Sequence, residues 1–196
     1  MALSKARFYS ALLALSAIAS PALADAQLSF AAASSTVQQG SGVDVQVLIS
    51  GVTDLYGYNF TLTYDASKLQ IGSITEGSFL STGGSTYFDG GDLSTAGTVS
   101  YTFGGLYGSG PGVSGSGVLA TIHFNAIGVG SSALNFTAAD TVFVSSVQDA
   151  GGFNSVINVT LNGSSLQVTA VPEPSTYLLM AAGLAGVGLW RRRQAA

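Results

Sequence analysis

The sequence predicts an all-β fold, a β-sandwich, for the middle of this 196-residue chain. Three observations support the prediction. Apolar and polar residues alternate with a period of two, turn-forming residues separate the alternating runs, and no amphipathic helix of useful length is present. Many short strands in one domain are typical of a sandwich, in which each sheet buries one face. Both ends of the chain differ in composition, and we expect them to be targeting segments.

The chain begins with the features of a secretory signal peptide. Lys5 and Arg7 precede an apolar stretch at residues 11–19, and the small residues Ala22 and Ala24 offer a cleavage site before Asp25. We therefore predict that residues 1–24 are a signal peptide and that the folded domain comprises residues 25–170.

Alternation within this domain is clearest in three runs, at residues 43–50, 56–64 and 118–126. Shorter runs follow at residues 99–103, 134–136, 157–161 and 166–168. Glycine-rich turns separate most of them. Asn162 and Gly163 both tolerate positive φ, so they predict a hairpin between residues 157–161 and residues 164–169.

The charge of the domain limits its partners. Between residues 25 and 170 there are nine acidic residues and one lysine, Lys68, which gives a net charge of −8. We expect no nucleic-acid binding, because such binding depends on Lys and Arg side chains that neutralise phosphates. The chain has no cysteine, so packing without disulfides must stabilise this exported domain.

Three segments resemble the strands of cohesin domains. They are residues 40–47, residues 58–69 around a Tyr-Asp turn, and residues 117–124, which read Gly-Val-Leu-Ala-Thr-Ile-His-Phe. Ala66 stands where the family usually has a proline, which makes that turn less rigid. The resemblance implies a jelly-roll sandwich that docks a protein partner, in characterised cases a calcium-loaded dockerin. We expect an exported, non-catalytic interaction module; the alternative is a carbohydrate-binding module for extracellular polysaccharide.

Few residues are candidates for a binding site or for chemistry. Tyr107 lies in a glycine-rich loop where burial is difficult, so it is the candidate for a binding surface. Asp89 and Asp92 could supply carboxylates to Ca²⁺, but they lack the full spacing of an EF-hand, so a plain loop is the favoured interpretation, and no other cofactor is expected. His123 is the only histidine and points away from the apolar face of its strand. We expect no catalytic residues; a glycosidase, which needs only two carboxylates, is the remaining enzymatic alternative.

The C-terminal tail, residues 171–196, has three parts in order. Pro172, Glu173 and Pro174 precede an apolar run at residues 176–190, and three arginines, Arg191, Arg192 and Arg193, follow at once. The prolines favour an extended, accessible backbone before the run. Its fourteen most apolar residues, 177–190, would span only about 21 Å as a helix, against a hydrocarbon core of about 30 Å. We predict a marginal transmembrane helix with a cytoplasmic basic end.

This order of parts closely resembles the PEP-CTERM sorting signal of Gram-negative bacteria. The resemblance implies processing by an exosortase. It also implies export across the inner membrane, with a transient membrane-anchored precursor held through residues 176–190, and then a location at the cell surface, in the exopolysaccharide matrix or in the medium. The alternative is a permanent single-span anchor.

Overall fold

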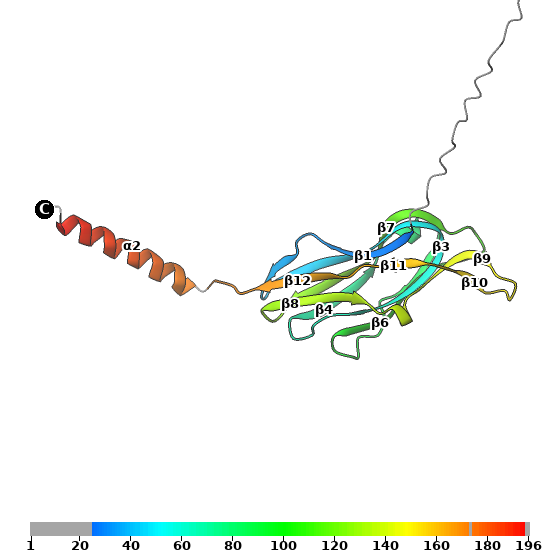
Figure 1. The fold of residues 1–196 in the computed structure, drawn as a ribbon, viewed down its shortest axis with the longest axis horizontal. Helices are drawn as coiled ribbons and strands as arrows, with labels where there is room; N and C mark the ends of the chain where they lie inside the picture. Colours follow the sequence, from blue (N-terminus) through cyan, green and yellow to red (C-terminus); the bar gives the residue numbers. More distant parts are fainter. Residues whose placement is uncertain (1–24, 173, 195–196) are drawn as a thin grey trace, which may run out of the picture.

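The computed structural model describes residues 25–172 and 174–194 (Figure 1). The predicted signal peptide, including Ala22 and Ala24, and Glu173 of the tail lie outside the described residues. The described chain is mostly β, as predicted, and ends in helix α2 (Pro174–Gln194). One continuous network of strands folds over at its longest member, β3 (Gly42–Thr63), into two facing layers.

The first layer is built around the N-terminal half of β3. This half pairs antiparallel with β7 on one side and with β1 on the other. In spatial order its strands are β4 (Leu69–Glu76), β7 (Val113–Ala126), β3, β1 (Ala26–Ala32) and β11 (Val159–Leu161).

The second layer is built around the C-terminal half of β3. Here β3 pairs with β6 on one side, and with β9 and then β8 on the other. Its strands are β5 (Thr86–Asp89), β6 (Thr98–Leu106), β3, the hairpin of β9 (Val142–Gln148) and β10 (Asn154–Ile157), then β8 (Gly130–Phe136), β12 (Ser164–Thr169) and β2 (Thr36–Gln38). The short helix α1 (Ser78–Ser81) and the 3-10 turn η1 (Ala138–Asp140) lie in the connections.

The crossing of β3 from one layer to the other depends on Gly51 and Asp54. Both have positive φ, 67° and 58°, and the pairing of β3 with β7 shifts register on either side of Val52. The Asp54 carboxylate accepts hydrogen bonds from the Gly112 amide at 2.6 Å and from the amide and hydroxyl of Ser146. Partial burial raises the pKa of Asp54, but the hydrogen bonds from Ser146 and Gly112 outweigh burial and hold this pKa below its ordinary value. Asp54 therefore ties β3 to both the loop before β7 and β9.

The core lies between the two layers and is made by the predicted alternation. Ala120, Ile122 and Phe124 of β7 face Phe60 and Leu62 of β3, and all five are buried. Aromatic contacts extend the core, with Phe30 stacked on Phe136 at 4.1 Å between ring centroids. Each layer thus buries the face that its period-two pattern indicates.

Two details of the predicted pairing are wrong. Asn162 and Gly163 do not join a hairpin, because β11 pairs with β1 in the first layer and β12 pairs with β8 in the second. The Asn-Gly turn instead carries the chain between layers. In β6, Val99 is buried whereas Phe103 is exposed, although simple alternation places them on one face. A bulge at Tyr101, whose φ is 56°, reverses the order because it inserts one residue opposite β3.

Helix α2 has the tail sequence that was expected to be helical. Its described side chains are exposed, and Arg191, Arg192 and Arg193 occupy its last turn. The prediction of a transmembrane helix is not met. Among residues 25–172 and 174–194, no helix is both long enough and apolar enough to cross a membrane, since the apolar run is short and ends at the arginines.

Candidate docking face

The outer surface of β5, β6, β3 and β9 is unusually apolar for a solvent-facing sheet. Cross-strand register places Tyr87 opposite Gly105, Phe103 opposite Asn59, and Val142 on the other side of Asn59. We call this surface the docking face. It comprises Gly57, Asn59, Tyr87, Tyr101, Phe103, Gly105, Val142 and Val144, with Tyr107 at its edge.

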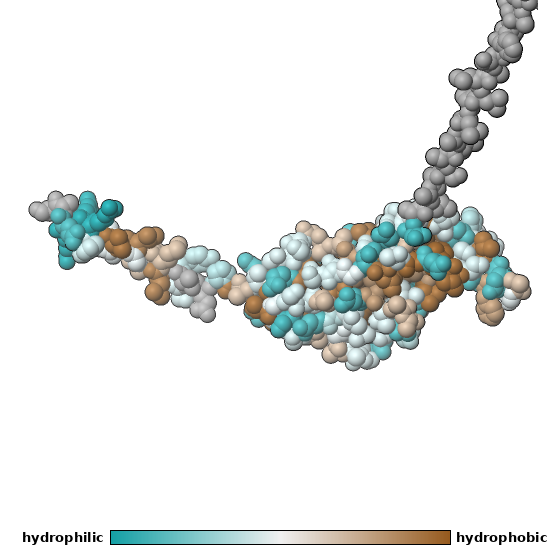
Figure 2. Space-filling view, in the orientation of Figure 1, coloured by the Kyte–Doolittle hydropathy of each residue, from teal (hydrophilic) through white to brown (hydrophobic). Residues whose placement is uncertain are grey.

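Large side chains on the docking face are exposed to solvent. The exposed fraction is 39% for Tyr87, Phe103 and Val142, 55% for Tyr101, and 67% for Tyr107. The space-filling view shows apolar surface in the half of the domain away from α2, near β1, β11 and β3 (Figure 2). Exposed apolar areas of this kind are typical of interaction sites.

Three aromatic rings form a cluster at one side of the face. The ring of Tyr87 lies between those of Tyr107 and Phe103. Its centroid is 5.3 Å from that of Tyr107, with an interplanar angle of 61°, and 6.3 Å from that of Phe103, with an angle of 56°. Gly105 makes room for this arrangement, since a Cβ there would lie 2.2 Å from the Tyr87 hydroxyl. The Tyr87 ring therefore lies across the glycine strand in a fixed position.

A shallow groove runs along the middle of the face. It has a volume of about 270 Å³ and lies between Tyr87 and Phe103 on one side and Val142 and Val144 on the other. Gly57 contributes no side chain to fill it. Tyr58 lies beneath, where its hydroxyl donates a hydrogen bond to the Leu119 carbonyl at 2.9 Å. Burial, with a smaller effect of the Glu76 carboxylate, raises the pKa of Tyr58 well above its ordinary value, so this hydroxyl stays a donor.

The rim of the docking face is acidic. Asp89 pairs in register with Phe103, and the Tyr101 hydroxyl donates to the Asp140 carboxylate at 3.5 Å. Lys68, the one cationic side chain between residues 25 and 170, belongs to another part of the domain, at the turn where its carbonyl accepts the Ile127 amide. A partner for this face would have an apolar centre and hydroxyl or basic groups around it.

The sequence predicted the exposure of one of these aromatic residues. Tyr107 is the most exposed of the cluster, as its glycine-rich loop indicated. Simple alternation in the run at residues 99–103 places Tyr101 and Phe103 on the face of the buried Val99, yet both are exposed. Phe103 faces solvent because of the bulge at Tyr101, and no local residue pattern predicts this bulge.

The carboxylates of Asp89 and Asp92 are engaged within their own loop. Asp89 accepts the Gly91 amide at 2.8 Å, and Asp92 accepts the amide and hydroxyl of Ser94. These Ser94 bonds hold the pKa of Asp92 below its ordinary value. Within the described ranges, no three His, Cys, Asp or Glu side chains gather as metal ligands would.

His123 lies on the outer surface of the first layer, as its strand pattern predicted. Its Nδ1 contacts the Asp44 carboxylate at 2.6 Å, and the two side chains are 42% and 65% exposed. Ser116, in the Gly-Ser-Gly sequence of β7, accepts a hydrogen bond from the Gly51 amide. Its hydroxyl therefore has a structural partner in a strand, which is no setting for a nucleophile elbow.

Comparison with known proteins identifies the family of the chain. The chain matches the cohesin domain family over residues 27–166, more than half of its length, and the PEP-CTERM protein-sorting motif over residues 170–193. No curated protein sequence matches the chain significantly.

Solved cohesin structures have the same fold. The seventh type I cohesin of scaffoldin B from Pseudobacteroides cellulosolvens is 18% identical, with a TM-score of 0.59, and the match covers 76% of this chain and 96% of that one. A non-cellulosomal cohesin from the archaeon Archaeoglobus fulgidus is 21% identical, with a TM-score of 0.55, and the match covers 79% of this chain and 96% of that one. The sixth cohesin of scaffoldin B from Acetivibrio cellulolyticus was solved in complex with a mutant dockerin. It is 24% identical, with a TM-score of 0.54, and the match covers 76% of this chain and 100% of that one.

The strand pattern, the two-layer fold and the family match over residues 27–166 agree. The chain belongs to the cohesin domain family, whose members are non-catalytic binding modules, and it carries a PEP-CTERM sorting motif at its C-terminus.

Proposed function

We propose that the domain is an exported docking module that binds a dockerin-type protein through the docking face. The observation that carries the proposal is the row of exposed Tyr87, Phe103 and Val142 beside a groove, on a sheet whose other side already makes the core. Interface centres are rich in aromatic residues, and a few such residues supply most of the binding free energy. Related cohesins have been solved in complex with dockerins.

The ring geometry favours a protein over a flat polysaccharide on this face. Tyr87 is tilted by 61° against Tyr107 and by 56° against Phe103, so the three rings do not share a plane. A flat glycan ribbon needs coplanar rings to stack on several sugars at once. A helix or loop with branched side chains can fill the spaces between tilted rings.

The tail gives this module its destination. A PEP-CTERM motif marks an exported surface protein that an exosortase processes. We propose that Pro172, Glu173 and Pro174, with the arginines of α2, form the recognition signal, and that the mature module is residues 25–170 after loss of both ends. In this proposal the cell is Gram-negative, and the module ends at the cell surface or in its polysaccharide matrix.

Calorimetry with dockerins from the source organism, in the presence of calcium, tests the docking proposal. The wild-type chain and Phe103→Ser are titrated with each dockerin, with Ile127→Ser as the matched control, because Ile127 is a similarly exposed apolar residue outside the face. We expect Phe103→Ser to weaken binding at least tenfold and Ile127→Ser to leave it unchanged. Absence of any dockerin binding, or equal affinity of both variants, contradicts the proposal.

Mass spectrometry of the protein isolated from its cells tests the processing proposal separately. We expect no peptide from residues 177–190 in the mature form. Replacement of Pro172 and Pro174 by alanine should retain the tail, because the proposed recognition signal loses both of its conformationally restricted residues. An unchanged mature mass in that variant would contradict the role of the prolines.

A further inference from the structure

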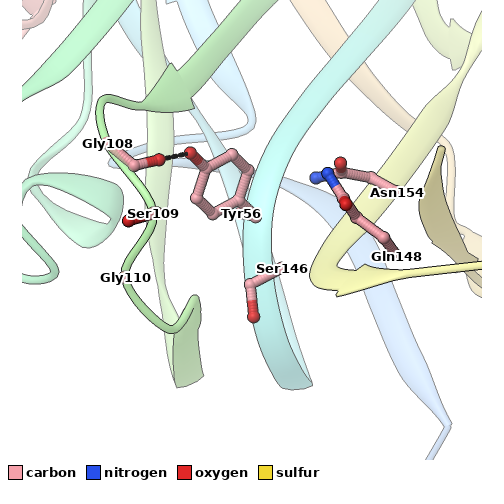
Figure 3. Close-up of a pocket in the computed structure, with 7 residues that line it drawn as sticks. All are labelled: Tyr56, Gly108, Ser109, Gly110, Ser146, Gln148 and Asn154. Atoms are coloured by element: carbon pink, nitrogen blue, oxygen red, sulfur yellow. Dashed lines mark hydrogen bonds between the residues drawn. The ribbon is translucent and has the colours of Figure 1, made fainter. Parts of the chain in front are cut away.

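A second, polar cleft lies apart from the docking groove. It has a volume of about 330 Å³ and opens between the loop after β6, residues 108–110, and the end of the β9–β10 hairpin next to its turn (Figure 3). The side chains that line it are Tyr56, Ser109, Ser146, Gln148 and Asn154. None of them carries a charge, and none belongs to the docking face.

One wall of this cleft is a ring held in place. The Tyr56 hydroxyl donates a hydrogen bond to the Gly108 carbonyl, which ties the ring to the loop. The amide ends of Gln148 and Asn154 point toward this ring from the hairpin side (Figure 3). The cleft therefore has an aromatic surface on one side and amide groups on the other.

Several polar groups in the cleft are available to a ligand. Within the described residues, the Gln148 amide and the Ser109 hydroxyl make no hydrogen bond to the protein. Asn154 donates through its Nδ2 to the Ser145 carbonyl at 2.8 Å, and this bond fixes its amide while its carbonyl oxygen stays available. Both donors and acceptors are thus offered to the same space.

The charge of the surroundings defines the class of ligand. Asp54 does not line the cleft, and its carboxylate already accepts hydrogen bonds from Ser146 and Gly112. An anion would find no cation here, and a cation would find no free carboxylate. Neutral hydroxyl groups, which both donate and accept, match an amide pair beside an aromatic ring.

We propose that this cleft binds a neutral sugar unit of an extracellular polysaccharide. The Tyr56 ring packs against one face of the sugar, and Gln148, with the Asn154 carbonyl oxygen, hydrogen bonds its hydroxyls. The cleft volume is at the lower end of the range for ligand pockets, about 300–1,000 Å³, which suits a single sugar or the end of a glycan chain. The module would then hold a protein on one surface and matrix polysaccharide in a separate cleft.

Saturation-transfer NMR on the full chain tests the inference. The probes are the methyl β-glycosides of glucose, galactose, xylose and N-acetylglucosamine and methyl α-mannoside, each at millimolar concentration. We expect transfer to at least one of them, and at least a tenfold weaker affinity in Gln148→Ala. Gln38→Ala, at an exposed glutamine on β2 away from the cleft, is the matched control and should bind as the wild type does.

The docking variant Phe103→Ser separates this inference from the proposed docking function. It should bind the glycoside normally, because Phe103 does not line the cleft. Loss of binding in Phe103→Ser with retention in Gln148→Ala would place the sugar on the docking face and overturn the inference. Absence of transfer to every probe, or equal affinity in Gln148→Ala and Gln38→Ala, would overturn it as well.

Discussion

The outer surfaces of the two layers share one alternating pattern and differ in chemistry. On the first layer, Asp44 lies opposite His123 and Gln46 opposite Thr121, and the surface is polar. On the second layer, the corresponding outward positions hold Tyr87, Phe103 and the valines of β9. Because the inner faces of both layers already make one core, the fold does not need the second apolar surface. An exposed apolar surface that the core does not need is the reason we propose it as the binding surface.

The two layers share one core. Removing a large core side chain from either layer should therefore destabilise the whole domain. Phe60 is fully buried from the second layer and Phe124 from the first. We expect Phe60→Ala and Phe124→Ala each to lower the free energy of unfolding by about 3–5 kcal/mol, because each leaves a large cavity. Urea unfolding followed by circular dichroism measures this loss. A cost below about 1 kcal/mol at either position would contradict a common core.

The docking face should respond differently from the polar face to surface substitutions. We expect the double variant Tyr87→Ser and Phe103→Ser to weaken dockerin binding by about 2–4 kcal/mol, roughly 30- to 1,000-fold, since both residues have the character of interface hot spots. The free energy of unfolding should change by less than about 1 kcal/mol. Calorimetry and urea unfolding of the same samples provide both numbers.

Gln46→Ser on the polar face is the control for that experiment. It is expected to change neither binding nor stability, because Gln46 is exposed and belongs to neither the core nor the docking face. If it weakens binding as much as the double variant does, the distinction between the two surfaces is wrong.

Asp54 lies where β3 passes from the polar layer to the docking layer. We expect Asp54→Asn to lower the free energy of unfolding at pH 7 by about 1–2 kcal/mol, since asparagine tolerates the positive φ but loses hydrogen bonds to a charged acceptor. The pKa of Asp54 is below its ordinary value in the folded protein, so its contribution is complete above the unfolded pKa.

The same contribution is lost as the pH falls through the folded pKa of Asp54. The difference between wild type and Asp54→Asn should therefore shrink in acid. Thermal unfolding from pH 7 to pH 2 checks this dependence, and a difference that stays constant over the whole range would exclude a stabilising role for the Asp54 charge.

The smallest effect is expected at the contact between His123 and Asp44 on the polar face. His123 and Asp44 are largely exposed, so His123→Gln should change the free energy of unfolding by less than about 1 kcal/mol and leave dockerin binding unchanged. Thermal unfolding and calorimetry measure the two quantities. A strong loss of binding in this variant would move the interaction site to the first layer.

Much of the fold could be predicted from local sequence. The alternation of residues 118–126 and 56–64 depends on whether each side chain faces core or solvent, and Ile122, Phe124 and Phe60 are buried as expected. The pairing of β11 and β12 could not be predicted, because an Asn-Gly turn joins strands of different layers as readily as strands of one hairpin.

The site was less predictable than the fold. Tyr107 could be identified because a loop offers it no cover. Phe103 faces solvent only because of a single bulge at Tyr101, and the polar cleft combines Tyr56, Ser109 and Gln148 from three distant segments. Both arrangements depend on packing between segments that are far apart in the sequence. Alternation within one strand cannot predict such packing.

Hydrogen–deuterium exchange of the chain with and without a bound dockerin tests the docking face most directly. We expect binding to slow exchange in β5, β6 and β9. In β4 and β7 the exchange rates should be the same with and without dockerin. Slower exchange confined to β4 and β7 would place the partner on the polar face and contradict the account.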